Sequence, residues 1–483
     1  MRYLKLQLRG GYRMSEEHER EWYIFTQNRE AVLEALQRGE CDGILPAARG
    51  FLDGFAEWCL AAGVLQVFEG FTDRRARRSI PMFFFCNTLI HRPLFHLPGV
   101  AAIERTLFRS PYILRQLGFN AQQMEEGFYK CADRGVPFRA HALREGFARS
   151  RAEDYLENQQ QMLRMLWAYC PGQLRGGVWA MDSVHVRIPR GSHSAAQEFK
   201  VCVLGLWQEE QVWPLLWMFV GADEAEITVG RKLIATAEAV LGEGTIRHLL
   251  VDRGYLDGEW LTTLRHHGTR VTIGVREDML ILEEMRNLSQ LSGMSWRQVQ
   301  PPKFHQEPKP RREVLSLPAL EAEWATCQVP LSSCLVRDTY PDKVEYYGLV
   351  TTEPQIAAED ILSDYGQRWA LEEAFMALTR YWHFDELPAC RVGVAYALVH
   401  FTLLAYTLLA FYLQDSEADP QTSVPPALPP LPLPERELAV YAGPHFALLL
   451  PSQLIAIILE HSDAWQANRA QLLMALRITE GKT

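Results

Sequence analysis

The sequence predicts an α/β protein in which a layered sheet domain in the middle of the chain is flanked by helical regions. Three observations carry this prediction. Residues 178–221 hold three strand-like segments in close succession, residues 226–276 alternate between helix-like and strand-like segments, and residues 73–170 carry apolar residues at helical spacing. A chain of 483 residues is also too long for one small domain, so several structural units are expected.

The N-terminal part of the chain is expected to be helical in two sections. Residues 1–72 combine acidic helix-like stretches with Gly and Pro breaks, whereas residues 73–170 form a basic helical region. Between residues 73 and 151 there are fourteen Lys and Arg against six Asp and Glu, a net charge of +8 in a chain whose total is −10. This basic segment is either a solvated arginine-rich surface or a face that contacts a DNA backbone.

Residues 171–276 are predicted to form the first part of the sheet domain. The segments VWAMDSVHVRI, FKVCVLGLW and VWPLLWMFVG are rich in β-branched and aromatic residues, which predicts three consecutive antiparallel strands. An amphipathic helix over 226–241 follows, and then a buried strand (IRHLLVD), a helix after Asp257 and a further strand (RVTIGV). A meander followed by βα units is typical of an α/β layered domain.

The chain beyond residue 276 is predicted to interrupt this domain and then to complete it. Residues 277–356 are expected to form a β-rich insertion, and residues 357–415 to supply a long helix over 360–383 and another over 393–413. Residues 416–434 form an extended linker, with seven Pro between 420 and 434. Residues 435–483 are expected to be a helical C-terminal segment.

The helix predicted over residues 393–413 has 21 residues and no formal charge, which is long enough to span a bilayer. It contains His400, two Thr and three Tyr, and no strongly basic cluster flanks it, so a helix buried in a protein core is the favoured interpretation. The chain has nine Cys without a CxxC pair, which indicates a reducing cytosol, and the N-terminal sequence lacks the apolar stretch of a signal peptide.

Three carboxylates stand out by their positions. Asp182 lies in the middle of an apolar strand, Asp252 ends a buried strand just before a turn, and Glu372 lies on the helix over 360–383. A carboxylate within an apolar strand is costly to bury unless it is paired or binds a metal. Taken singly, Asp252 can be a turn residue and Glu372 a solvated helix residue, but acids on neighbouring strands can converge into one site.

The pattern around these acids resembles the DDE transposases of bacterial insertion sequences, in the group with a β-strand insertion before the final Glu. The matching motifs are MDSVHV around Asp182, the turn Asp252-Arg253-Gly254-Tyr255, and a Y-(2)-R-(3)-E element formed by Tyr365, Arg368 and Glu372. The family's signature continues with a Lys seven residues after the Glu, where this chain has Thr379 followed by Arg380. On an ideal helix Arg380 points about 100° away from that position. The resemblance implies an RNase H-like catalytic core interrupted by the β-rich insertion.

The resemblance also implies the chemistry of the site. Asp182, Asp252 and Glu372 would be the catalytic residues and would hold two Mg²⁺ (or Mn²⁺) ions, with Asp182 binding both. Tyr365 and Arg368 would contact the cleaved DNA end, with a packing role as the alternative for Tyr365. Further DNA contacts are predicted at Arg253, at Arg380, at Trp296 as a platform for a flipped base, and at Arg74, Arg75, Arg77 and Arg78, for which a solvated loop is the alternative.

The predicted function is that of an insertion-sequence transposase that binds transposon ends and catalyses DNA strand cleavage and strand transfer. Its partners would be double-stranded DNA, as terminal inverted repeats and as target, and a second copy of the chain in a synaptic complex. It is expected to act in the bacterial cytoplasm at the nucleoid, without a membrane. The alternative is a domesticated, catalytically altered transposase that acts as a DNA-binding protein, which the Thr379 departure permits.

Overall fold

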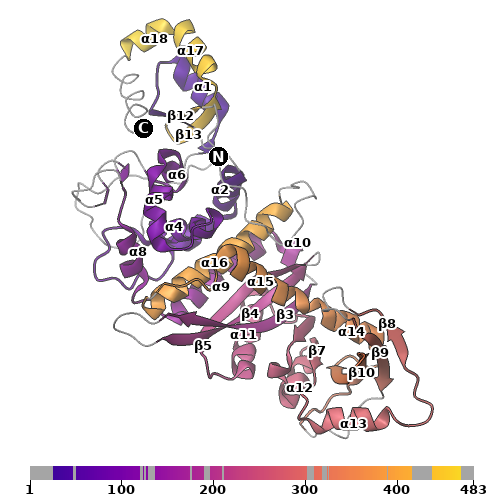
Figure 1. Cartoon of the computed structure of the whole chain (residues 1–483). Coiled ribbons are helices and arrows are strands. Elements are labelled where there is room, and N and C mark those ends of the chain that lie inside the picture. Colours follow the sequence, from indigo (N-terminus) through magenta and orange to yellow (C-terminus); the bar gives the residue numbers. More distant parts are fainter. Residues whose placement is uncertain are drawn as a thin grey trace. The chain divides into compact units, whose positions relative to one another are not determined.

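The computed structural model of the chain contains two compact units, one formed by Met1–Ser150 with Tyr381–Thr483 and the other by Arg151–Arg380. The two ends of the chain therefore belong to one unit (indigo and yellow in Figure 1). The structure describes residues 26–46, 51–119, 123–124, 127–128, 136–174, 177–189, 196–208, 211–301, 309–317, 324, 326–388, 390–415 and 438–468. The predictions for residues 1–25 and for the Pro-rich linker over 416–434 lie outside these residues.

The unit formed by Arg151–Arg380 is built, in its described residues, on a nine-stranded mixed sheet in the order β5-β4-β3-β6-β7-β11-β10-β9-β8. Strands β3, β4 and β5 are antiparallel neighbours, whereas β6 runs parallel to β3, and β7 parallel to β6. These five strands have the arrangement of an RNase H-like core, so the predicted fold class is confirmed. The strands are β3 (Val178–Ile188), β4 (Gln197–Gln208), β5 (Gln211–Gly221), β6 (His248–Val251), β7 (Arg270–Gly274), β8 (Arg297–Val299), β9 (Arg311–Leu317), β10 (Ser332–Thr339) and β11 (Val344–Thr351).

The helices of this unit begin and end where local chemistry favours it. Helix α12 starts after Asp257, whose side chain accepts a hydrogen bond from the Trp260 backbone N–H at 2.7 Å, and the chain leaves it through Gly268 at φ +86°. Helices α9 and α11 pack on β5, and α14 packs on β9, β10 and β11. The helices are α9 (Ala152–Tyr169), α10 (Pro171–Leu174), α11 (Glu226–Leu241), η3 (Arg253–Tyr255), α12 (Gly258–His266), α13 (Leu280–Leu288), α14 (Ala358–Gln367) and α15 (Trp369–Trp382).

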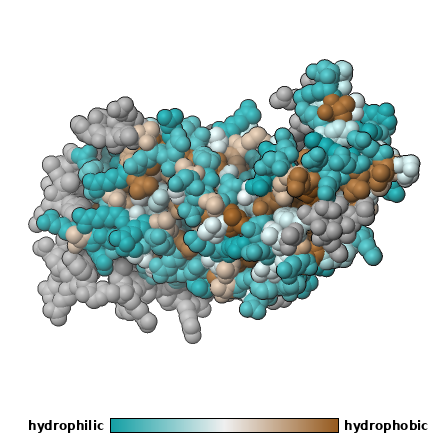
Figure 2. All heavy atoms as spheres, turned by 90° about the horizontal axis from the view of Figure 1, so that it is seen from below, coloured by the Kyte–Doolittle hydropathy of each residue, from teal (hydrophilic) through white to brown (hydrophobic). Residues whose placement is uncertain are grey.

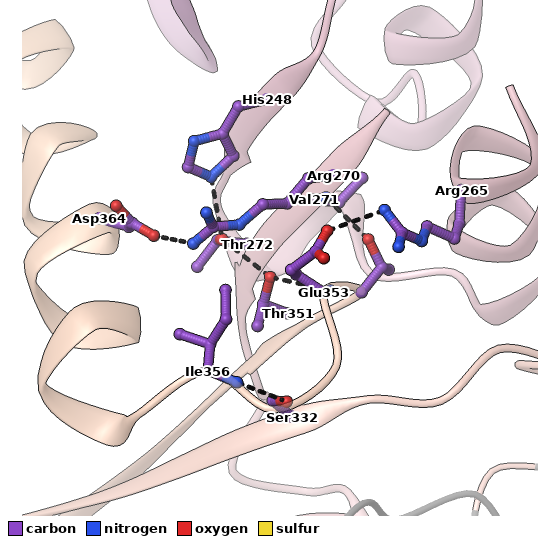
Figure 3. A network of polar contacts seen from close by, with 11 residues as sticks. His248, Arg265, Arg270, Val271, Thr272, Ser332, Thr351, Glu353, Ile356 and Asp364 are labelled. Carbon is purple, nitrogen blue, oxygen red and sulfur yellow. Dashed lines mark hydrogen bonds and ion pairs between the residues drawn. The ribbon is translucent and has the colours of Figure 1, made fainter. Parts of the chain in front are cut away.

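The strands predicted for the insertion are present, and they extend the core sheet rather than forming a sheet of their own. Strand β11 pairs antiparallel with β7, with Leu349 opposite Gly274. Polar contacts reinforce this join, as Figure 3 shows: the Thr272 hydroxyl lies 3.3 Å from that of Thr351, and Arg265 pairs with Glu353 at 2.9 Å. The insertion and the core therefore share one continuous hydrogen-bonded sheet.

The prediction of one long helix over residues 360–383 is wrong in one respect. Two helices, α14 and α15, occupy this segment and meet at Arg368. The Arg368 backbone N–H bonds the carbonyl of Tyr365, only three residues earlier, at 3.1 Å. This tightened turn follows Gly366, a residue of low helix propensity, and ends the α-helical hydrogen-bond ladder of α14.

The other unit is mainly helical around α16, whose predicted burial is confirmed. This helix passes the length and hydropathy test for a membrane span, but 94% of its apolar window is buried inside the protein. It packs on α4, and the Phe401 ring lies 6.0 Å from that of Phe68. The helices are α1 (Arg29–Gln37), α2 (Phe51–Ala62), α3 (Val64–Glu69), α4 (Met82–Leu94), α5 (Val100–Arg105), η2 (Leu107–Arg109), α6 (Pro111–Gln116), α8 (Ala140–Phe147), α16 (Val392–Asp415), α17 (Pro451–Glu460) and α18 (Ser462–Ala467).

A small sheet of order β1-β13-β12-β2 joins the N-terminal region to the C-terminal segment, so neither of them is entirely helical as predicted. Strands β12 and β13 pair as a hairpin whose two-residue turn is Gly443-Pro444, with Gly443 at φ +56°. One apolar core joins Val32 of α1 to Val440 and to Trp465 of α18. The strands are β1 (Thr26–Gln27), β2 (Gly43–Pro46), β12 (Leu438–Ala442) and β13 (His445–Leu449).

The molecular face drawn in Figure 2 is mainly hydrophilic, with hydrophobic residues in smaller groups among the charged ones. Among the large apolar side chains of the described residues, Leu280 and Leu459 are the most exposed, at 74% and 69%. Such isolated groups are ordinary on protein surfaces.

Candidate active site

Asp182 and Asp252 are brought together by the register of two parallel strands. Met181 of β3 lies opposite Val251 of β6, and each aspartate is the next residue along its strand direction. Parallel neighbours lie about 5 Å apart and present residues at matched positions to the same sheet face. The two carboxylates therefore share one face at the carboxyl end of β6.

Arg368 connects Asp182 to Glu372. Its Nη1 lies 3.0 Å from Asp182 Oδ2, and its Nη2 donates to Glu372 Oε1, four residues later in α15. The side chains are 10%, 18% and 31% exposed for Arg368, Asp182 and Glu372. Arg368 of the predicted Y-(2)-R-(3)-E element thus contacts two of the three predicted acids.

Tyr365 completes this cluster from the end of α14. Its hydroxyl lies 3.5 Å from Asp252 Oδ1, at the limit of a hydrogen bond, and the Arg368 guanidinium lies 5.3 Å from its ring centroid. A Cβ on Gly274, at the end of β7, would lie 2.9 Å from the same hydroxyl. Gly274 therefore leaves the space that the Tyr365 hydroxyl needs to reach Asp252.

The electrostatics of the cluster follow from burial and from the charge of Arg368. Burial raises the pKa of Asp182 to about 6; the Arg368 guanidinium opposes this rise, whereas Asp252 and Glu372 add to it. Burial also disfavours a charge on Arg368, but Tyr365, Glu372 and Asp182 hold its pKa above its usual range. Arg368 is therefore a charged group held between two acids and beside a phenol.

The helix that carries Tyr365 is fixed by the strands of the insertion. Ile361 of α14 is fully buried against Val336 and Leu349 in one apolar cluster. Asp364, which precedes Tyr365, forms an ion pair with Arg270 at the start of β7 (Figure 3). The insertion therefore supports one side of the site as well as extending the sheet.

The donor set of this cluster fits a hard divalent cation, because carboxylate oxygens are the ligands that Mg²⁺ and Mn²⁺ prefer. In the described residues, no three His, Cys, Asp or Glu side chains are arranged to hold an ion together. One carboxylate oxygen of Asp182 and one of Glu372 are engaged by Arg368. The residues present could hold an ion if the guanidinium moved away from them.

The other residues predicted near the site lie at different distances from this cluster. Arg253 directly follows Asp252, and its side chain is 57% exposed, 3.8 Å from Glu277. Arg380 is exposed in the last turn of α15, roughly 12 Å along the helix axis from Glu372. Trp296 precedes β8 in the insertion, with the Arg337 guanidinium 4.1 Å from its ring centroid, so one face of this ring is already covered.

The predicted basic run in the other unit divides into two kinds of residue. Arg75 is only 10% exposed, pairs with Asp73 at 2.7 Å and donates to the Ile80 carbonyl. Arg74, Arg77 and Arg78 are exposed. Arg75 thus has a structural role that the sequence does not reveal. The three exposed arginines are accessible to a ligand, although Arg78 also donates to the Asp73 carbonyl at 2.8 Å.

Glu226 is a residue beside the site that sequence reasoning missed. It is the first residue of α11, and its carboxylate accepts a hydrogen bond from Ser183, the residue after Asp182. The sequence gives only a weak signal for it, because an acidic residue in the first turn of a helix is common for electrostatic reasons.

Part of the chain is similar to known proteins. Residues 176–408 match the family described as "Transposase DDE domain". No curated protein sequence matches the chain. One similar solved structure is that of a piggyBac transposase synaptic complex with hairpin DNA, at 10% sequence identity and a TM-score of 0.38, with 75% of this chain and 76% of that chain covered.

Proposed function

Because residues 176–408 form a transposase DDE domain, we propose that the protein is an insertion-sequence transposase that binds transposon ends and catalyses metal-dependent DNA strand cleavage and strand transfer. One observation carries the proposal. Asp182, Asp252 and Glu372, which lie far apart in the sequence, converge at the end of a parallel strand pair around Arg368 and Tyr365. An acid cluster of this kind has no role in packing, since burying it costs free energy.

The three carboxylates would hold Mg²⁺ or Mn²⁺, and we propose two ions with Asp182 as a ligand of both. Such ions, when bound, activate the attacking oxygen and stabilise the charge on the leaving oxygen in phosphoryl transfer. The contribution of Arg368 is a forked donor group, and its Nε–H has no partner among the described residues. That donor and the Nη groups suit a DNA phosphate beside the carboxylates.

The proposed partners are double-stranded DNA, as terminal inverted repeats and as target, and a second copy of the chain in a synaptic complex. Exposed arginines next to the acids and in the basic segment support a DNA partner, because phosphate contacts supply most non-specific binding energy. We also propose that the protein acts in the bacterial cytoplasm at the nucleoid, since the long apolar helix α16 found among the described residues is buried inside the protein.

Cleavage of a labelled DNA fragment that carries the element's terminal repeats tests the proposal. Wild-type protein with Mg²⁺ should cut at the repeat ends, and Asp182→Ala should lower the cleavage rate by roughly 10²–10³-fold or more, because a lost metal ligand removes several kcal/mol of stabilisation. Binding of the same fragment should change little, because Asp182 is an acid and contributes no attraction to phosphate.

The matched control is Glu345→Ala, which removes a half-exposed carboxylate that pairs with Lys343 on the insertion. This control should cut at the wild-type rate. If wild-type protein binds the repeats but never cuts them under Mg²⁺ or Mn²⁺, the alternative of a domesticated DNA-binding protein is correct. Undiminished cutting by Asp182→Ala would refute the proposed mechanism.

A further inference from the structure

We infer that Glu226 is a positioning residue that holds the Asp182 and Asp252 segments in place from the opposite face of the sheet. The inference rests on the proposed function, since it concerns the ligands proposed for the metal ions. Glu226 has no hydrogen bond with either aspartate among the described residues, so it would act through the backbone segments that carry them.

The first contact is with the strand of Asp182. Glu226 accepts a hydrogen bond from the Ser183 hydroxyl. Successive side chains of a strand point to opposite faces, so Ser183 points away from the face of Asp182 and toward α11. The Ser183 backbone N–H in turn donates to Asp182 Oδ1 at 2.8 Å. A shift of Ser183 would therefore move a hydrogen-bond donor of the Asp182 carboxylate.

The second contact is with the turn that follows Asp252. An ideal Cβ added to Gly254 would overlap the Oε2 atom of Glu226, so this oxygen occupies the space of the missing side chain. Gly254 is not among the residues with positive φ, and its backbone conformation is open to any residue. The glycine of the Asp-Arg-Gly-Tyr turn thus leaves room for the Glu226 carboxylate in its present position, and a larger residue there would displace it.

The third contact supplies a charge partner. Lys200 of β4 places its Nζ 3.9 Å from Glu226 Oε1 and donates to the Glu224 carbonyl at 3.1 Å. The Lys200 and Glu226 side chains are 13% and 22% exposed, so their attraction is only partly screened by water. Lys200 therefore fixes the start of α11 and orients the Glu226 carboxylate toward Ser183 and Gly254.

These contacts tie together three elements of the core. Ser183 is one residue beyond Asp182 on β3, and Gly254 is two residues beyond Asp252 at the end of β6. The two strands are parallel neighbours, so one carboxylate that touches both segments sets how far apart the aspartate backbones lie. Outer partners of metal ligands commonly change metal affinity by about 10–100-fold when they are removed.

A purely structural role for Glu226 gives a different expectation. An acid at the first position of a helix interacts favourably with the helix dipole and stabilises the folded protein by about 0.3–1 kcal/mol. That contribution affects stability alone. Glu259 in the first turn of α12 is a matched residue, because it is also an acid at a helix start but is exposed. Glu259→Ala therefore reports the dipole effect without the proposed positioning effect.

The test is calorimetric titration of the full-length protein with Mn²⁺ in the absence of DNA. We expect Glu226→Ala to weaken Mn²⁺ affinity by about tenfold or more, and Glu226→Gln by less, since an amide oxygen still accepts from Ser183. Gly254→Ala should weaken it similarly by displacing Glu226. The double variant Gly254→Ala/Glu226→Ala should bind no more weakly than Glu226→Ala alone, because the added methyl group then meets no carboxylate.

Three results would overturn the inference. One is wild-type Mn²⁺ affinity in Glu226→Ala, with or without a loss of stability, and another is an equal loss in Glu259→Ala. The third is additive losses in the double variant. If Glu226→Ala does not fold, Glu226→Gln and Gly254→Ala still decide between these outcomes. A wild-type protein that neither binds Mn²⁺ nor cuts repeat DNA would instead refute the proposed function itself, and the inference with it.

Discussion

Arg368 is the residue on which the charge balance of the site depends. Its guanidinium lies between Asp182 and Glu372, so it supplies the positive charge that buried carboxylates need. A divalent cation bound by these acids would compete with it for the same oxygen atoms. Metal binding at the cluster therefore favours a position of Arg368 against another anion, and a DNA phosphate is an anion of suitable geometry.

Replacing Arg368 by Ala should lower the free energy of unfolding of the metal-free protein by about 3 kcal/mol, because buried carboxylates lose their charge partner. Added Mn²⁺ should restore most of this loss, since the cation takes over the neutralisation. Wild-type protein should gain less from Mn²⁺, because the guanidinium must first be displaced. Urea unfolding with and without Mn²⁺ measures both effects.

The control for this prediction is Arg297→Ala, which removes an arginine whose side chain is 72% exposed and pairs with Glu359. A surface pair of this kind contributes about 1 kcal/mol or less, and its loss should not respond to Mn²⁺. Equal stabilisation of wild type and Arg368→Ala by Mn²⁺ would show that the guanidinium and the ion do not compete.

For single residues, the sequence predicts the acids of the site but not the side chains that contact them. Asp182 and Asp252 are recognisable because each carboxylate lies in or directly after an apolar strand. Burying a carboxylate there costs free energy unless it is paired or binds a metal. The pair between Arg368 and Asp182 joins residues 186 positions apart, and no local pattern encodes such a contact. The sequence does not single out Glu226, because an acid in the first turn of a helix is common for electrostatic reasons.

Among the elements, α14 shows why the insertion matters for the site. Its apolar face packs on the strands of the insertion, and its last residues carry Tyr365 toward Asp252. Alternation of apolar residues predicts those strands individually. It does not predict that β11 pairs with β7, because the polar, Pro-rich sequence between them favours a separate subdomain. The same limit applies to the small sheet, whose strands β1 and β13 come from opposite ends of the chain.

Helix α16 carries a buried histidine that should make the protein sensitive to acid. Burial lowers the pKa of His400 from 6.5 to about 3, and its ring lies 4.8 Å from that of Phe401. Because the folded-state pKa is the lower one, the unfolded chain binds the proton first as the pH falls below about 6.5. The stability that neutral His400 allows is therefore present at pH 7 and is lost progressively toward acid pH.

The variant His400→Phe should retain more stability at acid pH than wild type does, by on the order of 3 kcal/mol near pH 4. Urea unfolding at neutral and at acid pH measures the difference between the two proteins. His141→Gln, at a histidine that is 77% exposed, should follow the wild-type pH dependence. A parallel pH dependence of His400→Phe and wild type would contradict the prediction.

For the whole molecule, net charge is a poor guide to the DNA partner. The chain carries −10 overall, yet residues 73–151 carry +8. The structure reduces the part of this charge that can meet DNA, because Arg92 and Arg115 are buried at 1% and 6% exposure. Arg75 is held by Asp73. The arginines that remain exposed, Arg77 among them, are the ones that can release counterions from a DNA backbone.

Binding of repeat DNA should therefore weaken steeply with salt despite the acidic pI, and Arg77→Ala should lower the slope of log Kd against log salt by about one unit, because each phosphate contact contributes about 0.9. Arg75→Ala is the matched variant, with the same change in charge two residues away. It should leave the slope unchanged and lower the stability instead, since it removes the contacts to Asp73 and to the Ile80 carbonyl. Titrations by fluorescence anisotropy across roughly 50–200 mM salt give the slopes, and urea unfolding gives the stabilities. If Arg75→Ala lowers the slope as much as Arg77→Ala does, the two arginines act on DNA only through the summed charge of the segment, and the division into structural and accessible arginines is wrong.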